Sequence, residues 1–526
     1  MNLMTKNISY KFVLWAAFIL TVCLRLPSVF QELPPYLYCD EGMFSGEVLR
    51  MLTSDTFIVN DFRAGGVNVY PVLILFKLWG IFSTEFPSLS DVVVVGRLVH
   101  VVSLSSLAVF FIFHLTNNLF DNKRIGLYAV LGFVISPMVY GISRYWYPDH
   151  YIVVFASGFL FFLSEAFKYK PTLKSSIGIG VFWALTVSTK YTGLLFAIPI
   201  FVLMTIYLWE NRDKDKIKKA FSRSVVCSLI ILAAFTLVFS AFNFSLFVNT
   251  EKFVADFMFN INNYSREEPK LFLGFIWEGA KFYFLTAYVM TLGIAGFLVF
   301  SLGYLGVLLK SKPLFFLLTC FPAFLIIYLG NAGMFINRNM MILLPFILPV
   351  FGYGLFSIHK FSLNFSGKKR ILIKALLALV VIFPSAQTGY AFIHDFQPDS
   401  RVLAHDWVNK HIPAGATIGM NEFCSGYSPA ANATNRLAVD PHMQNGHNYY
   451  VLNSYWRGVL DPVYRNRLGV WQVIDQKYLW FHNSLDSNFY RKVDKSVTID
   501  STIPNDYKVL KVFDSNGPDI VILEKK

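Results

Sequence analysis

Hydrophobic residues in this chain gather in runs about as long as a membrane-crossing helix. Eleven such runs are separated by polar turns within residues 1–392. A helix of about 20 apolar residues spans the hydrocarbon core of a bilayer. The pattern predicts an α-helical polytopic membrane protein with about 11 transmembrane helices, or 12 to 13 if shorter apolar segments also cross. The runs cover approximately residues 12–26, 92–115, 125–142, 151–167, 176–189, 192–209, 224–247, 284–309, 314–330, 340–358 and 371–392.

Lysine and arginine residues concentrate in alternate turns between these runs. With eleven spans, every basic cluster falls on the same side as Lys6 and Lys11. Cytoplasmic loops carry an excess of Lys and Arg, so we place this side inside. The net charge of +13 then reflects membrane orientation, and no nucleic-acid partner is expected. The clusters are Lys123–Arg124, Lys168 to Lys174, Arg212 to Arg223, Lys310 with Lys312, and Lys360 to Arg370.

One further apolar stretch, residues 67–82, would invert every later cluster if it crossed the membrane. We therefore place it on the outer surface, within a first outer loop of residues 27–91. This loop is expected to contain two interfacial helices, near residues 41–53 and 68–82. The first places Phe44, Val48, Met51 and Leu52 on one face, as an amphipathic helix does.

Hydropathy falls sharply after Phe392. The pattern predicts a helix over 402–411, a strand near 417–420, and strands over 509–513 and 519–523. Residues 1–392 are thus expected to form a membrane domain and residues 393–526 a small C-terminal α/β extracytoplasmic domain. A second outer segment, residues 249–281, is expected to be helical at the interface. The five cysteines lack metal-ligand spacing, and a pair of Cys39 with Cys424 is open on grounds of compartment alone.

Candidate chemistry lies at the outer ends of the helices. Asp40 and Glu41 begin the first interfacial helix, and Asp149 begins a later span. Arg144, Lys190 and Arg338 are isolated cations in outer turns that are otherwise poor in basic residues. Cations bind phosphate oxygens, and a carboxylate can take a proton from a nucleophile. A lipid-linked sugar phosphate is a substrate class that needs both.

Each of these residues also has an ordinary structural interpretation. An Asp-Glu pair at a helix start can be a simple N-cap, and a cation at a helix end can reach lipid headgroups. Tyr145 to Tyr147 are typical of an interfacial aromatic belt. His100, on an apolar helix, is expected to be packed and hydrogen-bonded. The catalytic hypothesis depends on the joint placement of the acids and cations.

Four motifs follow one another in the order known from one enzyme superfamily. They are Asp40-Glu41 in the first outer loop, the turn from Arg144 to Asp149, the turn from Thr189 to Tyr191, and Arg338 before a Leu-Pro-rich helix. This arrangement resembles the GT-C glycosyltransferases. It is most similar to bacterial relatives of protein O-mannosyltransferases and aminoarabinose transferases, glycosyltransferase family 39 and its neighbours.

The resemblance implies that one sugar moves from a polyprenyl-phosphate carrier to a lipid, glycan or protein acceptor on the outer face of the membrane. Asp40 would be the catalytic carboxylate, and Glu41 would position it or the sugar hydroxyls. Asp149 would be a second acidic residue, while Lys190 and Arg338, helped by Arg144, would neutralise the lipid phosphate. No resident metal is expected, although a divalent cation is used by some relatives. The family also implies a multi-pass protein of the cytoplasmic (inner) membrane, with its active site and C-terminal domain on the periplasmic side, acting in the cell envelope.

Two other functions fit parts of the pattern. A polytopic transporter or lipid flippase would also bind an anionic lipid, and the adjacent runs 176–189 and 192–209 could be a broken helix. A membrane scaffold would explain the C-terminal domain and leave the outer acids and cations unexplained. Substituting Asp40 by Asn distinguishes an enzyme, which would lose turnover, from a scaffold.

Overall fold

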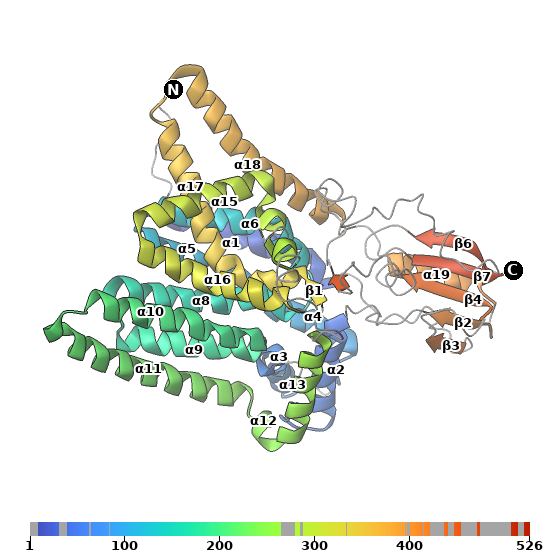
Figure 1. Ribbon diagram of the computed structural model, residues 1–526. Coiled ribbons are helices and arrows are strands. Elements are labelled where there is room, and N and C mark those ends of the chain that lie inside the picture. Colours follow the sequence, from blue (N-terminus) through green and yellow to red (C-terminus); the bar gives the residue numbers. More distant parts are fainter. Residues whose placement is uncertain are drawn as a thin grey trace.

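The computed structural model consists of a helical bundle followed by a mixed β-sheet (Figure 1). Figure 1 shows the sheet at one end of the bundle, away from the turn between the two long helices α17 and α18. The structure describes residues 9–30, 39–62, 65–83, 85–264, 279–284, 288–332, 334–394, 396, 400–413, 415–420, 436–439, 447–453, 471–473, 507–513 and 520–526.

Nine helical segments of the described residues are long and apolar enough to cross a membrane. The chain is therefore a multi-pass membrane protein, as the hydropathy predicts. These segments are built from α1 (Tyr10–Arg25) with η1 (Leu26–Phe30); α4 (Leu89–Gly96), η2 (Arg97–Leu104) and α5 (Ser105–Phe120); α8 (Pro148–Tyr169); η3 (Tyr191–Phe196) with α10 (Ala197–Glu210); α11 (Lys214–Phe242); α15 (Met290–Lys310); α16 (Lys312–Gly330); η5 (Asn337–Leu343) with α17 (Leu344–Ser362); and α18 (Gly367–His394).

Two of the eleven predicted spans correspond to shorter helices. Residues 125–142 form α6 (Lys123–Ile135) and α7 (Pro137–Ile142) rather than one helix. Proline cannot donate a backbone hydrogen bond, and the extended residue Ser136 caps the new helix by accepting from the Val139 amide. The span predicted at 176–189 is α9 (Leu173–Thr189), which has 17 residues.

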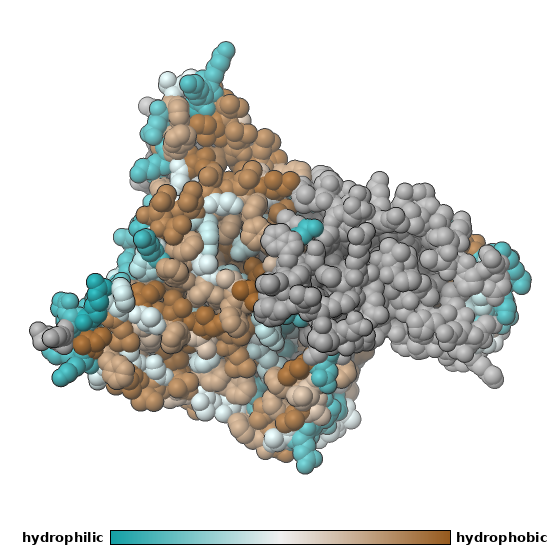
Figure 2. Space-filling model, in the orientation of Figure 1, coloured by the Kyte–Doolittle hydropathy of each residue, from teal (hydrophilic) through white to brown (hydrophobic). Residues whose placement is uncertain are grey.

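The helices share one apolar core. Helix α8 packs between α5 and α9, α9 packs on α11, and α17 packs on α6 and α15. Many large apolar side chains on the outer faces of the bundle are exposed, as expected where lipid is the solvent. Figure 2 shows this hydrophobic surface, with hydrophilic residues gathered at the ends of α10, α11, α17 and α18.

Both helices predicted in the first outer loop are present. They are α2 (Cys39–Thr53) and α3 (Gly66–Trp79), which pack against each other. Phe44, Val48 and Met51 of α2 are fully buried. The apolar face of α2 therefore packs into the protein, because neighbouring helices cover it.

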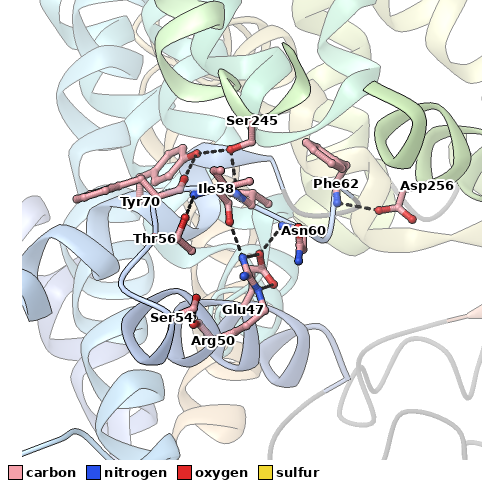
Figure 3. A network of polar contacts seen from close by, with 12 residues as sticks. Glu47, Arg50, Ser54, Thr56, Ile58, Asn60, Phe62, Tyr70, Ser245 and Asp256 are labelled. Atoms are coloured by element: carbon pink, nitrogen blue, oxygen red, sulfur yellow. Dashed lines mark hydrogen bonds and ion pairs between the residues drawn. The ribbon is translucent and has the colours of Figure 1, made fainter. Parts of the chain in front are cut away.

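A polar network fixes the link between α2 and α3 (Figure 3). Glu47 accepts from the Asn60 amide at 2.6 Å and pairs with Arg50 at 2.7 Å. Ser245 accepts from the Val59 amide at 2.9 Å. This network joins the first outer loop to α12 (Ser245–Val248) and α13 (Thr250–Tyr264), the helix that begins the predicted interfacial segment 249–281. Residues 265–278 of that segment lie outside the described residues.

The C-terminal part contains the predicted helix and strands. Helix α19 (Ser400–His411) precedes a sheet of order β3-β2-β4-β7-β6, in which β2 is parallel to β3 and β4, and β7 is antiparallel to β4 and β6. Ala404 and Val408 of the helix are buried with Ile418 and Ile522 of the sheet. The strands are β2 (Thr417–Met420), β3 (Arg436–Val439), β4 (Tyr449–Asn453), β6 (Tyr507–Phe513) and β7 (Ile520–Lys525).

A second, two-stranded sheet connects the C-terminal part to the bundle. Strand β1 (Met334–Ile336) pairs in parallel with β5 (Trp471–Val473). Strand β1 directly precedes η5, which carries Arg338. Main-chain pairing thus brings residues 471–473 to the same end of the bundle as the predicted acids and cations.

Candidate active site

Three predicted residues meet at one end of the bundle. Lys190 donates hydrogen bonds from Nζ to Asp149 Oδ1 at 2.5 Å and to Asn339 Oδ1 at 2.7 Å. Arg338 Nε lies 3.4 Å from the other carboxylate oxygen, Asp149 Oδ2. Asp149 is in the first turn of α8, and Lys190 follows the last residue of α9. Arg338 and Asn339 are in the first turn of η5. Turns far apart in sequence therefore form one acid–cation cluster.

The acid of this cluster is more deeply buried than its two cations. Asp149 retains 4% of its side-chain exposure, whereas Lys190 retains 23% and Arg338 17%. The guanidinium of Arg338 also lies 4.6 Å from the ring centroid of Tyr147. A buried carboxylate and an aromatic ring thus hold two partly exposed cations. Among the described side chains of this cluster, the formal charges of one acid and two cations sum to one positive charge, which suits an anionic ligand.

Glu41 lies in a separate buried ion pair. Both of its carboxylate oxygens accept from Arg97, from Nε and Nη2, at 2.7 Å each. Glu41 Oε1 also accepts from the backbone amide of Trp146 at 2.6 Å, and Arg97 Nη1 donates to the Ser28 carbonyl at 2.9 Å. Both side chains of the pair are fully buried. Glu41 therefore ties the first turn of α2 to η2 and to the turn before Asp149.

Close packing supports this clamp. The His100 ring stacks on Trp146 with centroids 5.2 Å apart, and its two nitrogens are 3.1 and 3.0 Å from the carbonyls of Gly96 and Val67. A Cβ atom at Gly96 would lie 2.1 Å from the Trp146 ring, so this position requires glycine. Both Arg97 and His100 are on η2, a stretch of π-helix within a long span. His100 is packed and hydrogen-bonded, as predicted.

Asp40 is next to Glu41 in the first turn of α2. Its side chain, like that of Cys39, lies outside the described part, as do Tyr38 and Cys424. The backbone of Asp40 is nevertheless placed by its neighbour, because the Glu41 side chain accepts two hydrogen bonds from Arg97 and one from the Trp146 amide. The predicted catalytic role of Asp40 stays a prediction.

The turn from Arg144 to Asp149 differs from its interpretation as an interfacial belt. Tyr145, Trp146 and Tyr147 are all buried, with 6% exposure or less. Trp146 packs against α2 and η2, Arg97 of η2 lies over the Tyr145 ring, and Arg338 of η5 lies over the Tyr147 ring. Arg144 donates to the Gly141 carbonyl at 3.3 Å and lies 5.3 Å from the Tyr145 ring centroid. The aromatic residues are therefore packed inside the protein beside the acid–cation cluster, and the contacts described for Arg144 are with the end of α7 and with Tyr145.

Two residues of the site were missed in the sequence. Asn339 is next to Arg338, and an amide there carries no recognisable signal. Arg97 had one, because a charged residue inside an apolar run is unusual and marks function or a buried partner. Within the described ranges, no three His, Cys, Asp or Glu side chains cluster in a way that could hold a metal ion.

Comparisons with known proteins concern the family and the fold. Residues 86–241 match the family model described as dolichyl-phosphate-mannose-protein mannosyltransferase. A sequence search of the curated proteins gives no match. Among solved structures, the fold is similar to that of the archaeal oligosaccharyltransferase AglB from Archaeoglobus fulgidus, with a TM-score of 0.54, 14% identity, and coverage of 97% of this chain and 80% of that chain. It is also similar to apo ArnT from Cupriavidus metallidurans, with a TM-score of 0.50, 13% identity, and coverage of 85% and 94%.

Fold and site together define a polytopic membrane protein that gathers acids and cations at one end of a helical bundle. The family match covers residues 86–241, from α4 to α11, and the chain shares the fold of the GT-C membrane glycosyltransferases. The predicted GT-C fold, membrane class and enzyme class are thereby confirmed, and the transporter alternative is not favoured.

Proposed function

We propose that this glycosyltransferase moves one sugar from a polyprenyl-phosphate donor to a lipid, glycan or protein acceptor on the outer face of the membrane. The family description names a dolichyl-phosphate mannose donor, and the similar AglB structure is a complex with a dolichol-phosphate. The basic clusters at the opposite end of the bundle support an outer, periplasmic location for the site.

The observation that carries the proposal is the cluster of Lys190, Arg338 and Asp149. When the sugar leaves, negative charge develops on the lipid phosphate, and cations positioned beforehand stabilise that charge. Lys190 and Arg338 keep part of their surface accessible to such a phosphate. Asp149 faces the same two cations from the buried side, so its role in this mechanism is to orient them.

The acceptor half of the reaction is assigned to Asp40. A positioned carboxylate that takes the acceptor proton contributes roughly 10²–10⁴-fold to the rate. Glu41 is the adjacent residue, and its bonds to Arg97 and Trp146 link the helix turn of Asp40 to the chain that leads to Asp149. Glu41 is thus a positioning residue in this proposal. One rigid unit would present the base and the phosphate-binding cations to the same substrate.

The proposal is tested by sugar transfer in membranes that contain the full chain. A panel of radiolabelled polyprenyl-phosphate sugars is incubated with these membranes and a cell-envelope extract. We expect Asp40→Asn to lower transfer by about 10²–10⁴-fold. We expect Lys190→Met to lower kcat/KM for the donor by about 10–100-fold, the value of one charge-assisted hydrogen bond. Lys190→Arg should recover part of this loss because it keeps the charge.

The matched control is Lys77→Met, which removes one cation outside the cluster; Lys77 pairs with the exposed residue Asp55. It should leave transfer unchanged. Equal losses of sugar transfer in Lys77→Met and Lys190→Met would mean that transfer depends on general surface charge and not on the cluster. Absence of transfer from every donor by a folded wild-type chain would refute the assigned donor class.

A further inference from the structure

A cavity of about 470 Å³ lies at the opposite end of the bundle from the candidate active site. It opens between the end of α5, the start of α6 and the ends of α15 and α17. Lysine, asparagine and serine side chains line it together with aromatic rings. The polar lining is formed by Lys310, Lys360, Asn122, Ser357 and Asn364, and two of the rings are Phe120 and Tyr353.

The course of α17 locates this cavity relative to the bilayer. The helix begins at Leu344, six residues after Arg338, and ends at Ser362 beside the cavity. Its 19 residues span about 28 Å at ~1.5 Å per residue. The hydrocarbon core of a bilayer is about 30 Å thick. The cavity is therefore at the headgroup level of the leaflet opposite the active site, near the turn between α17 and α18 (Figure 1).

The cations of this cavity are available to an anion. Lys310 Nζ lies 5.6 Å from the ring centroids of both Phe120 and Tyr353, and these rings stack at 4.8 Å. Within the described part of the chain, neither Lys310 nor Lys360 pairs with a carboxylate. The nearby acid Asp121 is engaged by Lys168 at 3.0 Å. The two lysines therefore leave an uncompensated charge of two at the cavity.

Hydrogen-bonding groups and apolar surface accompany this charge. Asn122 uses its amide oxygen to accept from the Arg124 backbone, which leaves its NH₂ group as a donor toward a ligand. Leu309, next to Lys310, is 79% exposed, and Phe361, next to Lys360, is 56% exposed. Exposed leucine and phenylalanine beside a membrane-level cavity suit acyl chains, whereas a free phosphate would gain nothing from them.

We propose that this cavity binds the phosphate headgroup of an anionic phospholipid from the leaflet opposite the active site. The two ammonium groups pair with the lipid phosphate, and Asn122 and Ser357 contact the glycerol backbone or headgroup. The acyl chains lie along the apolar surface at Leu309 and Phe361. The site is distinct from that for the sugar donor, because a full helix length separates the two.

Native mass spectrometry of the delipidated full-length protein tests this proposal. The probes are phosphatidylglycerol, zwitterionic phosphatidylcholine and inorganic phosphate, each added separately to the same detergent. We expect wild type to retain phosphatidylglycerol in preference to the other two. K310A/K360A should weaken phosphatidylglycerol binding by about 30-fold, because each lysine near a membrane surface contributes about one factor of 5 to 6.

The matched control is K218A/K219A, which removes two lysines from α11 at the same end of the bundle, outside the cavity. It should retain phosphatidylglycerol as wild type does. A second variant, Ser357→Phe, fills the cavity and keeps both lysines, and we expect it to lose the lipid as well. Elution as a single folded species in size-exclusion chromatography is required of each variant before its binding is measured.

Three results would overturn the inference. Unchanged phosphatidylglycerol retention in K310A/K360A would show that the cavity is not the site. An equal loss in K218A/K219A would show diffuse attraction to basic residues at this end. Inorganic phosphate retained as well as the lipid would assign the cavity to a soluble anion.

Discussion

Replacing Glu41 by glutamine removes the charge of a carboxylate that accepts hydrogen bonds from Arg97 and from the Trp146 amide. The substitution keeps the shape of the side chain. Its new NH₂ group, however, faces a donor of Arg97, and the buried guanidinium loses its counterion. Breaking a fully buried ion pair by removing one partner typically costs about 3–5 kcal/mol. The 0% exposure of both side chains places this pair in that class.

The assay is unfolding of the purified, detergent-solubilised chain, followed by tryptophan fluorescence with increasing denaturant. Glu41→Gln, Arg97→Gln and the double variant form a thermodynamic cycle. We expect the double variant to lose less stability than the sum of the single variants by about 1–3 kcal/mol, because two glutamines can bond to each other. Glu165→Gln is the control, since its pair with Lys174, at 3.5 Å, is largely exposed on the lysine side. That variant should lose less than about 1 kcal/mol.

The same variants separate positioning from chemistry. At a temperature where Glu41→Gln remains folded, we expect reduced sugar transfer, because the turn that carries Asp40 loses the acceptor for Arg97 Nη2 and the charge that strengthens the bond from the Trp146 amide. Additive losses in the cycle would refute the clamp. So would a Glu41→Gln variant as stable as Glu165→Gln.

Three further perturbations follow from the packing and the loop network. Gly96→Ala places a Cβ atom 2.1 Å from the Trp146 ring, so we expect a loss of about 1–3 kcal/mol in the same unfolding assay and reduced transfer. Ser245→Ala removes the acceptor of a buried backbone amide and should cost about 1–3 kcal/mol. The hydrogen bond from Lys77 lowers the pKa of Asp55, so the stability lost in Asp55→Asn should be small at neutral pH. It should shrink as the pH falls below about 4, the usual pKa of an Asp carboxyl, and vanish once the pH is below the lowered pKa, where the folded wild-type carboxyl is also protonated.

Each of these three predictions would be refuted by a specific result. Wild-type stability of Gly96→Ala would mean that the ring has room to move. Thr250→Ala is the control for Ser245→Ala, because it removes an exposed hydroxyl that donates to the Leu246 carbonyl of the preceding helix α12. Equal losses in the two variants would show that the loop network does not stabilise the fold. A deficit of Asp55→Asn that grows toward acid pH would have the wrong sign for a carboxyl with a lowered pKa.

The sequence indicated which residues belong to the candidate site, but it did not indicate which of them pair with each other. The charge bias between turns singled out Lys190 and Arg338, because outer turns are poor in cations. Nothing in the sequence indicated that both cations would share Asp149. Glu41 was assigned to the site from its motif, but its partner Arg97 comes from a different helix 56 residues away. Tyr145 to Tyr147 resemble a lipid-facing belt in sequence, whereas in the structure all three are buried.

The sequence by itself determined the membrane class, most of the helices and the side of the bundle at which acids and cations stand. In a bilayer every backbone group must be bonded within the protein, so an apolar run of sufficient length becomes a helix whatever its neighbours are. The break before Pro137 is local in the same way. The tertiary structure decided which turns meet, which carboxylate is buried against a guanidinium, and where two lysines line a cavity with no carboxylate partner among the described residues. Those outcomes depend on how helices pack across large sequence separations, and a local pattern of residues does not predict that packing.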